Sequence, residues 1–467
     1  MWLGRTRHLH FVGIGGIGMS GIAELVANLG YRVSGSDARR SDITDRLAAL
    51  GVRIDEGHDA AHVADADVVV VSSAIATDNP EVVAARGRHV PVIPRAEMLA
   101  ELMRLRVGIA VAGAHGKTTT TSMVALMLER AGLDPTAVIG GRLSAFGSNA
   151  KLGRGQFMVV EADESDRSFL KLSPTIAVVT NIDREHMDAY GSFDRLVEAF
   201  RDFADRVPFY GAVIACIDDA AVRALLPSLG RRTITYGFSA DADVHGLEPK
   251  GDGRSSGCRV IYRVRGVPDG VGQGTLELPV PGRHNVLNAL AAITVGLELG
   301  VPFDRMQAAL ADFGGAERRY QIRGTRAGVT VVDDYGHHPT EIAAVLRAAR
   351  EGHPARLVVV FQPHRFSRTR DLLDDFGPAL AQADVVMLTD IYAAGEAAIP
   401  GVTLDALARA VAPHVARLVV TPRLEDVPAV IAGDARPGDL VITLGAGSIA
   451  GLADRLLAAL STTEVRP

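Results

Sequence analysis

The chain has 467 residues, a net charge of −6 and a pI near 6.2, and this length suggests three domains instead of a single hydrophobic core. The acidic balance without a long Lys/Arg block argues against nucleic-acid and anionic-membrane partners, and no apolar run reaches transmembrane length. With only Cys216 and Cys258 and no signal-peptide pattern, we expect a cytoplasmic α/β protein that binds small molecules.

The first predicted unit is a strand, a glycine loop and a helix. The apolar residues 9–12 lead into GIGGIGMSG, which begins at Gly13 with GxGxxG spacing. A second strand at residues 31–34 leads to Asp37, where this fingerprint places an acid beside a ribose hydroxyl. Tight packing of the helix on the strand, without a ligand, would require the same glycines. The candidate substrate-binding residues here are Gly15, Gly16, Gly18 and Asp37.

Alternating strands and helices continue, and polar residues follow two of the strands. His58 comes after the predicted strand at residues 52–54, and Ser72 and Ser73 come after the one at residues 67–71. Ligands of open α/β sheets bind outside the carboxyl ends of the strands, so these are further substrate candidates. For His58, a loop histidine without a ligand is an equal alternative.

The most informative stretch is VAGAHGKTTTT. It follows a β-branched apolar run at residues 107–111 and precedes helical periodicity at residues 122–131. A strand, a glycine loop and a helix N-terminus bind phosphate through backbone N–H groups, Lys117 adds charge, and Thr118 offers a hydroxyl for Mg²⁺. Lys117 stands out because only four of the 49 basic residues are lysines. The loop is a shortened variant, since Val111 occupies the place of the first glycine, and a glycine turn with a solvated lysine is the alternative. The candidate nucleotide-binding residues are Gly113, Ala114, His115, Gly116, Lys117, Thr118 and Thr119.

Acidic side chains follow the next two buried strands. Residues 157–160 lead into EADESD, and residues 176–180 lead into NIDREHMD, which contains His186. Because Mg²⁺ usually takes one or two carboxylates together with water and phosphate, we favour Glu161, the first acid after its strand. The candidate metal ligands are Thr118, Glu161 and His186; a capping or solvated role is the alternative for His186.

Two asparagines open a helix after a glycine-rich segment. Residues 241–279 have short alternating strands and suggest a β excursion at the edge of the central domain, followed by PGRHNVLNAL. Asn285 and Asn288 lie about one turn apart, and their amides can match the edges of adenine. N-capping alone would explain Asn285.

The remaining sequence predicts another α/β sheet with a polar site. ERRYQ places two arginines at a domain junction, where guanidinium groups suit phosphate. The strand at residues 329–332 leads into DDYGHHPTE, and the strand at residues 357–361 leads into QPHRFSRTR. These loops are rich in His and Arg, which indicates a functional site and not a segment of the hydrophobic core. The two Gly loops upstream, in separate domains, imply two phosphorylated ligands, one a diphosphate nucleotide and the other a triphosphate with Mg²⁺.

Eight segments occur in an order that resembles the Mur ligases over essentially the whole chain, and within that family the branch that adds L-alanine. They are HFVGIGGIGMSGIAEL, GAHGKTTTT, EADESD, NIDREHMD, GRHNVLNAL, ERRYQ, DDYGHHPTE and QPHRFSRTR. The resemblance implies a three-domain α/β enzyme: a Rossmann-like domain for the UDP-sugar (residues 1–105), a central P-loop ATPase domain (106–316) and a C-terminal Rossmann-like domain for the amino acid (317–467).

The resemblance also implies the reaction and its ligands. ATP, with Mg²⁺ or Mn²⁺, would activate the carboxylate of UDP-N-acetylmuramate as an acyl phosphate, which the amine of L-alanine attacks. The partners would be these small molecules only, and the enzyme a monomer or weak homodimer. The implied catalytic residues are Lys117, Glu161, His186, Arg319 and Asp334. The family pattern places Asn288 at adenine, Arg319 at the phosphates and Asp334 near the ATP ribose or phosphates. His337, His364, Arg365 and Arg368 would line the region of the acyl phosphate and amino acid.

One feature departs from the wider family, and other functions stay open. Several Mur ligases carry a carbamylated lysine near the metal, whereas this chain has no lysine between Lys171 and Lys250. No general base for the amine is assigned. A ligase that attaches a recycled tripeptide to the same UDP-sugar, and a nucleotide-binding regulatory module without catalysis, are the alternatives. A nicotinamide dehydrogenase is disfavoured by the phosphate loop.

Overall fold

The computed structural model describes residues 3–72, 74–143, 148–263 and 270–462, so the substrate candidate Ser73 lies outside the described residues. The strands form three separate sheets. Across the described ranges, no helix combines the length and the hydropathy that crossing a membrane requires. Packing divides the chain into one unit of residues 1–247, 259–276 and 287–313 and a second of residues 248–258, 277–286 and 314–467.

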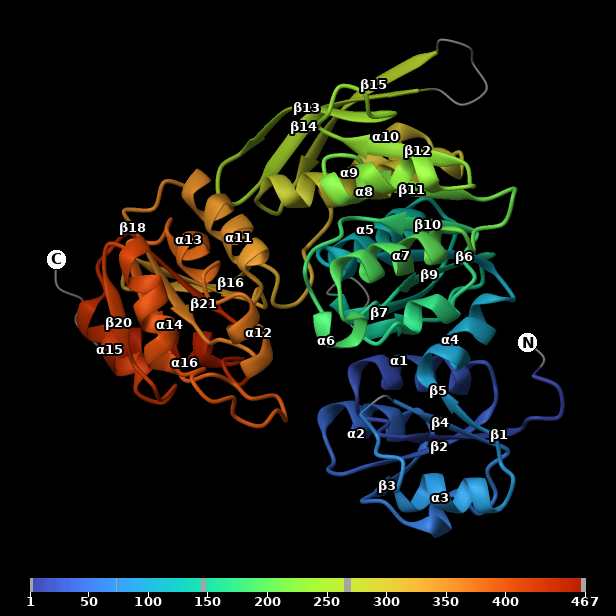
Figure 1. The fold of residues 1–467 in the computed structure, drawn as a ribbon. Helices are drawn as coiled ribbons and strands as arrows, with labels where there is room; N and C mark the ends of the chain where they lie inside the picture. Colours follow the sequence, from blue (N-terminus) through green and yellow to red (C-terminus); the bar gives the residue numbers. More distant parts are fainter. Residues whose placement is uncertain (1–2, 73, 144–147, 264–269, 463–467) are drawn as a thin grey trace. The chain divides into compact units, whose positions relative to one another are not determined.

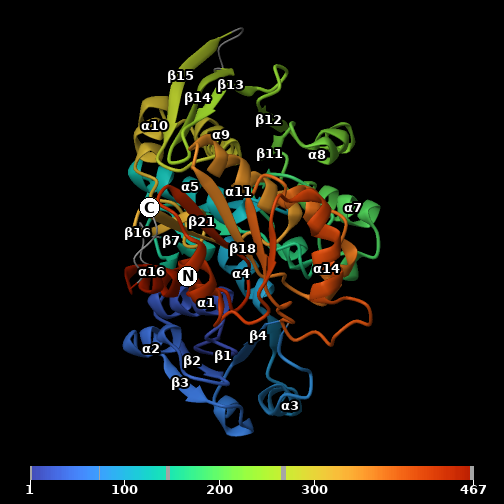
Figure 2. The ribbon, with the colours of Figure 1, turned by 90° about the vertical axis from the view of Figure 1, so that its left-hand side faces the viewer.

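The N-terminal sheet has five parallel strands in the order β3-β2-β1-β4-β5. Its strands are β1 (His8–Val12), β2 (Arg32–Asp37), β3 (Arg53–Glu56), β4 (Val68–Val71) and β5 (Val92–Pro94), and its helices are α1 (Ile17–Asn28), α2 (Asp42–Ala49), the short η1 (Ala60–Val63), α3 (Pro80–Gly87) and α4 (Arg95–Met103). Figures 1 and 2 show α1 and α3 on opposite faces of this sheet. All residues of β1 are buried, as expected for a parallel strand that is covered on both faces. The chain order reverses between β1 and β4, which makes the carboxyl ends of these strands a ligand crevice.

The central sheet has ten strands in the order β15-β14-β13-β12-β11-β10-β6-β9-β7-β8. The strands are β6 (Val107–Ala112), β7 (Thr136–Leu143), β8 (Ser148–Lys151), β9 (Phe157–Glu161), β10 (Ile176–Val179), β11 (Ala212–Cys216), β12 (Thr233–Gly237), β13 (Val244–Gly251), β14 (Ser256–Arg263) and β15 (Val271–Leu278). The helices are α5 (Lys117–Arg130), α6 (Met187–Tyr190), α7 (Phe193–Ala204), α8 (Ala220–Leu225), α9 (Arg283–Glu298) and α10 (Phe303–Ala311), with the short η2 (Ser168–Lys171) and η3 (Leu226–Ser228). Since β6 pairs in parallel with both β9 and β10, the loops after these three strands meet at one edge.

One sequence expectation for this sheet changes in the structure, and another, the β excursion at its edge, is confirmed with longer strands. Helix α5 begins at Lys117 and not at residue 122, because Gly116 takes the left-handed conformation that ends the loop and packing overrides the low helix propensity of four threonines. The glycine-rich segment forms three strands of eight residues, β13 to β15, which extend the central sheet.

The C-terminal sheet has six strands in the order β16-β17-β21-β18-β19-β20, with only β16 antiparallel to its neighbour. The strands are β16 (Gln321–Arg326), β17 (Val329–Asp334), β18 (Arg356–Phe361), β19 (Val385–Leu388), β20 (Leu418–Val420) and β21 (Asp439–Leu444). The helices are α11 (Pro339–Glu351), α12 (Phe366–Asp371), α13 (Phe376–Leu380), α14 (Leu404–Val411), α15 (Val427–Asp434) and α16 (Leu452–Thr462), with the short η4 (Ala412–His414). The DDYGHHPTE and QPHRFSRTR segments leave the carboxyl ends of β17 and β18, which flank β21, so the sheet itself brings these polar loops together.

Candidate functional site

The phosphate loop lies between β6 and α5. Gly113 and Gly116 adopt φ angles of 142° and 81°, which side chains rarely permit. A Cβ on Gly113 would collide with Oγ1 of Thr180, and one on Gly116 with the side chain of Asn288. Both positions therefore require glycine, and the loop presents its backbone at the N-terminus of α5, where N–H groups attract phosphate.

His115 joins this loop to the loop after β10. Its backbone N–H donates to Oδ1 of Asn181 at 2.8 Å, and its Nε2 lies 2.9 Å from Oδ2 of Asp183. The side chains of Thr180 and Asn181 donate to the carbonyl of His115 at 2.7 and 3.0 Å. The N–H of Ala114 donates to the carbonyl of Asn181 at 3.1 Å. These bonds hold the loop in one shape before any nucleotide binds.

The side chain of Lys117 is half-buried and its ammonium is held inside the loop. Its Nζ donates to the carbonyls of Gly113 and Ala114 at 2.6 and 3.1 Å and to Oε1 of Glu164 at 2.8 Å. Burial by itself would lower the pKa of Lys117, but the charge of Glu164 raises that pKa well above its usual range. The lysine is therefore a permanent positive charge, and Thr118 beside it is half-buried.

Glu164, Glu185 and His186 form the acidic cluster next to Lys117. One ligand atom from each lies within 4.8 Å of the others. Oε2 of Glu164 is buried and has no hydrogen-bond partner in the part of the chain that the structure describes. Burial raises the pKa of Glu164 to about 7, and the charge of Lys117 opposes this shift. An unsatisfied buried carboxylate oxygen beside a second carboxylate and an imidazole fits a divalent cation such as Mg²⁺.

The favoured sequence candidate Glu161 lies beside this cluster. Its Oε2 accepts a hydrogen bond from the N–H of Gly140 at 2.8 Å, and its charge contributes to the raised pKa of Lys117. His186, in contrast, lies 3.8 Å from Oε1 of Glu164 and adopts a φ of 57°, an uncommon conformation for a residue other than glycine. The structure thus brings His186 together with Glu164 and keeps Glu161 near the lysine.

Aromatic packing positions the acidic loop. The ring of Phe169 lies 5.3 Å from that of Phe200 and 5.1 Å from that of Phe203, both on α7. The N–H of Phe169 donates to the carbonyl of Asp163 at 3.0 Å. The hydroxyl of the buried Tyr190 donates to the carbonyl of Glu164 at 2.6 Å. The loop therefore rests on a hydrophobic core, which limits its movement.

The two asparagines of α9 have different surroundings. Oδ1 of Asn288 accepts from Oγ1 of Thr120 at 3.2 Å, and its side chain faces Gly116 of the phosphate loop. Nδ2 of Asn285 donates to the carbonyl of Pro281 at 2.7 Å, a contact within the start of its own helix. Asn288 therefore belongs to the phosphate loop, while the contact of Asn285 is local. The candidate Thr119 is buried in the first turn of α5.

The first glycine loop is held by Asp37. Oδ2 of Asp37 accepts from the N–H of Gly15 at 2.8 Å, and a Cβ on Gly15 would approach the same oxygen at 2.9 Å. Gly16 is exposed at the start of α1, and a Cβ on Gly18 would collide with Arg95. Asp37 thus shapes the loop directly and remains partly exposed at the end of β2.

His58 and Ser72 both lie at the carboxyl ends of strands in the N-terminal sheet. His58 follows β3, and its side chain is 25% exposed. Ser72 follows β4, and its Oγ would lie 3.9 Å from a Cβ on Gly13. Ser72 and the glycine loop therefore flank the crevice between β1 and β4. His58 follows β3, which is separated from β4 by the two strands β2 and β1.

Asp334 and Arg319 lie at the end of β17. Asp334 is buried, and its carboxylate accepts from the N–H groups of Tyr320 and Gly336, both at 2.6 Å. Burial raises the pKa of Asp334 to about 6, and the charge of Arg319 opposes this shift. The guanidinium of Arg319 lies 3.5 Å from Glu341 and over the ring of Tyr335, 5.1 Å from its centre. Asp334 thus fixes the backbone that presents Arg319.

His337, His364, Arg365 and Arg368 form the second polar group of the C-terminal sheet. The rings of His337 and His364 are 5.5 Å apart, and NH1 of Arg368 lies 3.3 Å from Nδ1 of His364. Burial, with the nearby charges of His337 and Arg368, lowers the pKa of His364 to about 3. Arg365 adopts a φ of 71° and lies 3.8 Å from Glu396. The group therefore presents two permanent cations and a neutral imidazole.

Tyr392 and Gln362 were not singled out by the sequence reasoning. The ring of Tyr392 stacks on His364 at 5.6 Å, and a Cβ on Gly447 would meet the Tyr392 ring and Oε1 of Gln362. Oε1 of Gln362 also accepts from the N–H of Ile449 at 2.9 Å. The sequence could have pointed to both residues through their positions just after β18 and β19, because the ends of these strands share the edge that carries His364.

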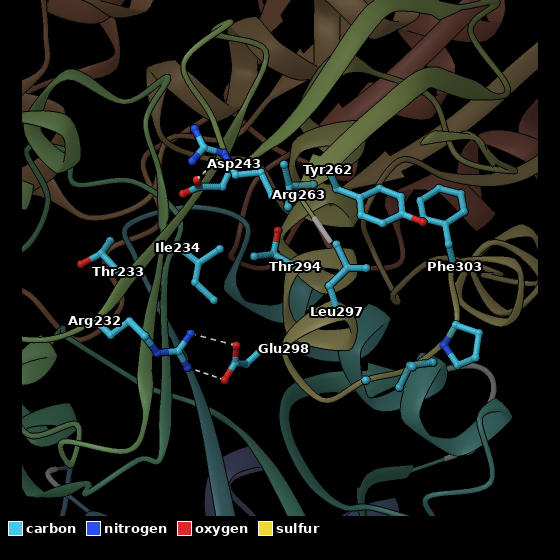
Figure 3. Close-up of a pocket in the computed structure, with 14 residues that line it drawn as sticks. Arg232, Thr233, Ile234, Asp243, Tyr262, Arg263, Thr294, Leu297, Glu298 and Phe303 are labelled. Carbon is cyan, nitrogen blue, oxygen red and sulfur yellow. Dashed lines mark hydrogen bonds and ion pairs between the residues drawn. The ribbon is translucent and has the colours of Figure 1, made fainter. Parts of the chain in front are cut away.

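A cavity of about 450 Å³ lies elsewhere in the central domain, between β12 to β14 and the loop from α9 to α10 (Figure 3). The rings of Tyr262 and Phe303 stack there at 5.3 Å. Its charged side chains are paired with each other: Arg232 with Glu298, and Arg263 with Asp243 at 3.3 Å. This pairing leaves the cavity without a clear group for binding phosphate or carboxylate, so we keep it separate from the candidate site.

Comparison with known proteins finds three family models along the chain. Residues 8–106 match the catalytic-domain model of the Mur ligase family, residues 111–296 the Mur ligase middle domain and residues 318–447 the glutamate ligase domain of Mur ligases. A UDP-N-acetylmuramate–L-alanine ligase of an Anaeromyxobacter strain is 55% identical over 455 residues, which cover 97% of this chain and 98% of that one. The crystal structure of a UDP-N-acetylmuramate–alanine ligase from Thermotoga maritima has a TM-score of 0.80 at 30% identity, covering 97% of this chain and 98% of that one. A murein peptide ligase from Psychrobacter arcticus has a TM-score of 0.70 at 26% identity, covering 98% and 100%.

Proposed function

This chain belongs to the Mur ligase family, and we propose that it joins L-alanine to the carboxylate of UDP-N-acetylmuramate with ATP as the energy source, the first step of stem-peptide synthesis in peptidoglycan. The observation that carries the proposal is the 55% identity to an alanine-adding ligase over 97% of the chain. We also propose functional domains at residues 1–105, 106–316 and 317–467, which respectively bind the UDP-sugar, ATP and the amino acid.

Transfer of the γ-phosphoryl group to the muramoyl carboxylate requires positive charge, because two anions must approach each other. Lys117 is suited to this role, since its pKa is raised and its three hydrogen bonds hold it within the loop. The loop amides from Gly113 to Gly116 and the first turn of α5, with Thr118 and Thr119, would bind the phosphates. Asn288 and, less directly, Asn285 would lie toward adenine.

Mg²⁺, or Mn²⁺ in its place, would be held by Thr118, Glu161 and His186, with Glu164 as a further oxygen ligand. When bound, the ion neutralises charge on the phosphate oxygens. The buried, unsatisfied oxygen of Glu164 supports a cation at this position. Lys117, which donates to Glu164 at 2.8 Å, would direct its ammonium to the γ-phosphate of bound ATP.

The acyl phosphate is then attacked by the amine of alanine, and phosphate leaves. Arg319 and Asp334 would stabilise the nucleotide end of this reaction. Arg365 and Arg368 offer planar guanidinium groups that suit a carboxylate such as that of alanine. His337 and His364 would line the same region. The residues proposed to bind the UDP-sugar are Gly15, Gly16, Gly18, Asp37, His58, Ser72 and the next residue in the sequence, Ser73.

The proposal is tested by phosphate release from ATP and Mg²⁺ with purified protein. UDP-N-acetylmuramate is supplied with L-alanine, with the tripeptide L-Ala-γ-D-Glu-diaminopimelate or without an amine. We expect release that depends on both the UDP-sugar and L-alanine. Release with the tripeptide alone would assign the chain to recycling, and no release in any mixture would favour a regulatory nucleotide-binding protein.

A further inference from the structure

The carboxylate of Glu81 is buried under the carboxyl ends of β1, β2 and β3, where it collects several polar side chains. Its Oε2 accepts from Oγ of Ser36 at 2.6 Å and lies 2.9 Å from Nδ1 of His58. Its Oε1 lies 2.7 Å from Nδ1 of His62 and 3.4 Å from Nε2 of His10. Neither Glu81 nor His10 has exposed side-chain surface. Such a cluster requires a defined arrangement of protons, because each unmatched buried polar atom is costly.

Hydrogen-bond direction fixes the tautomer of His58. Burial alone would raise the pKa of Glu81, but the close approach of His10 and hydrogen bonds from Ser36, His62 and His58 lower it to about 2. The carboxylate is therefore ionised and can only accept hydrogen bonds. Nδ1 of His58 also lies 3.1 Å from Oγ of Ser36, but the one proton of that hydroxyl is donated to Glu81, so Nδ1 must itself carry a proton and donate it. In a neutral imidazole the other nitrogen, Nε2, is left as an acceptor.

A second chain of hydrogen bonds orients His10 toward Glu81. Nδ1 of His8 donates to the carbonyl of Asp65 at 2.9 Å, and burial lowers the pKa of His8, so its Nε2 is an acceptor. Oγ of Ser34, at 2.7 Å from that Nε2, must donate to it and accept from Nδ1 of His10 at 2.8 Å. Nε2 of His10 then faces Oε1 of Glu81 at 3.4 Å.

The location of His58 connects this network to ligand binding. The carbonyl of Ser36 accepts from the N–H groups of Gly13 and Ile14 at 2.8 and 3.0 Å, while its hydroxyl donates to Glu81. One residue thus joins the buried carboxylate to the glycine loop. His58 is the member of the cluster with the most exposed side chain, 25% against 20% for His62.

We propose that Glu81 is a positioning residue for the UDP-sugar: it holds His58 as the neutral Nδ1–H tautomer, so that Nε2 accepts a hydrogen bond from an N–H or O–H group of the bound uridine nucleotide. The inference rests on the proposed function, because it assigns the ligand of this edge of the sheet to a uridine diphosphate sugar. Glu81 itself does not touch the ligand.

The first test needs no substitution. Nitrogen NMR of histidine-labelled protein near pH 7.5, with the His58 signal assigned by its loss in His58→Phe, reports which ring nitrogen carries hydrogen. We expect Nδ1–H in the free protein and retention of that tautomer on addition of UDP. Observation of Nε2–H or of imidazolium at His58 would overturn the proposal, whether or not the protein ligates alanine.

The second test measures binding and kinetics of Glu81→Gln, whose amide can donate to Nδ1 and so favours the other tautomer. We expect the Kd and KM for UDP-N-acetylmuramate to rise about 10-fold, as for one lost hydrogen bond, with kcat and the KM for ATP within about twofold of wild type. Glu56→Gln, at an exposed position on β3, is the matched control and should bind as wild type. A folded Glu81→Gln protein that binds the UDP-sugar as tightly as wild type would overturn the proposal.

Comparing UDP with CDP identifies the donor. A loss of affinity in Glu81→Gln for UDP alone assigns the imide N–H of uracil, which cytosine lacks. An equal loss for both nucleotides assigns a hydroxyl group, and both results support the positioning role. No loss for either contradicts it. If wild-type protein shows the Nδ1–H tautomer and binds UDP but does not ligate alanine, the proposed function fails while this inference stands.

Discussion

Replacing Lys117 by methionine removes a charge while keeping a side chain of similar length. The ammonium donates to Gly113, Ala114 and Glu164, so the variant loses all three hydrogen bonds. Because phosphoryl transfer depends on preorganised positive charge, we expect kcat to fall by at least ~10²-fold. The fold should persist, since the main chain of the loop is also held by Asn181.

The same substitution leaves Glu164 buried without its cation, and this has a predictable stability cost. Without Lys117, the pKa of Glu164 in the folded variant lies further above its ordinary value of 4.5 than the wild-type value of about 7, so the folded variant keeps a proton that the folded wild type releases above pH 7. The stability deficit relative to wild type is therefore small below about pH 7 and grows by up to about 1.4 kcal/mol for each pH unit above it.

Denaturant unfolding at about pH 6 and pH 9, together with phosphate release, separates the two effects. The double variant Lys117→Met/Glu164→Gln removes both charges, so it should regain most of the lost stability and none of the activity. A folded Lys117→Met protein with wild-type kcat would refute the phosphate-loop assignment. A stability deficit that is equal at both pH values, or that persists in the double variant, would refute the buried-pair argument.

Three further outcomes are expected. Gly113→Ala should abolish detectable ATP binding by calorimetry, because its Cβ would collide with Oγ1 of Thr180. The control Gly132→Ala, with a φ of 79° and open space around it, should cost only ~1 kcal/mol of stability and leave ATP binding unchanged. Equal effects of the two substitutions on ATP binding would contradict the steric argument. His364→Gln should raise the KM for L-alanine without changing the pH dependence of kcat/KM between about pH 6 and 9. The reason is that the pKa of His364 is lowered to about 3, so the ring is neutral throughout this range. Loss of an inflection in that range in the variant would show that His364 titrates there. Arg368→Lys should raise the KM for L-alanine about 10-fold and leave the KM for ATP unchanged, because lysine cannot form the planar double contact with a carboxylate; an unchanged KM for alanine would move its binding away from Arg368.

The sequence alone was sufficient for the local motifs. Strand-loop-helix order around Lys117 follows from apolar periodicity and glycine spacing, which are properties of neighbouring residues. The motifs that end β17 and β18 could likewise be assigned to one edge of a parallel sheet, because side chains after parallel strands share that edge. The resemblance to Mur ligases then supplied the fold, which the comparisons confirm.

Contacts between distant residues were decided only by the tertiary structure. Sequence order favoured Glu161 as the acid of the metal site, but the aromatic anchors of the following loop are what turn Glu164 toward Lys117 and His186. Glu81, in the first turn of α3, was not singled out by the sequence reasoning. Its partners His10 and Ser36 lie on two different strands, and their convergence depends on the sheet order β3-β2-β1-β4-β5, which periodicity does not encode. Local patterns specify which segments form, whereas burial and hydrogen bonding between segments decide which of several chemically equivalent side chains is used.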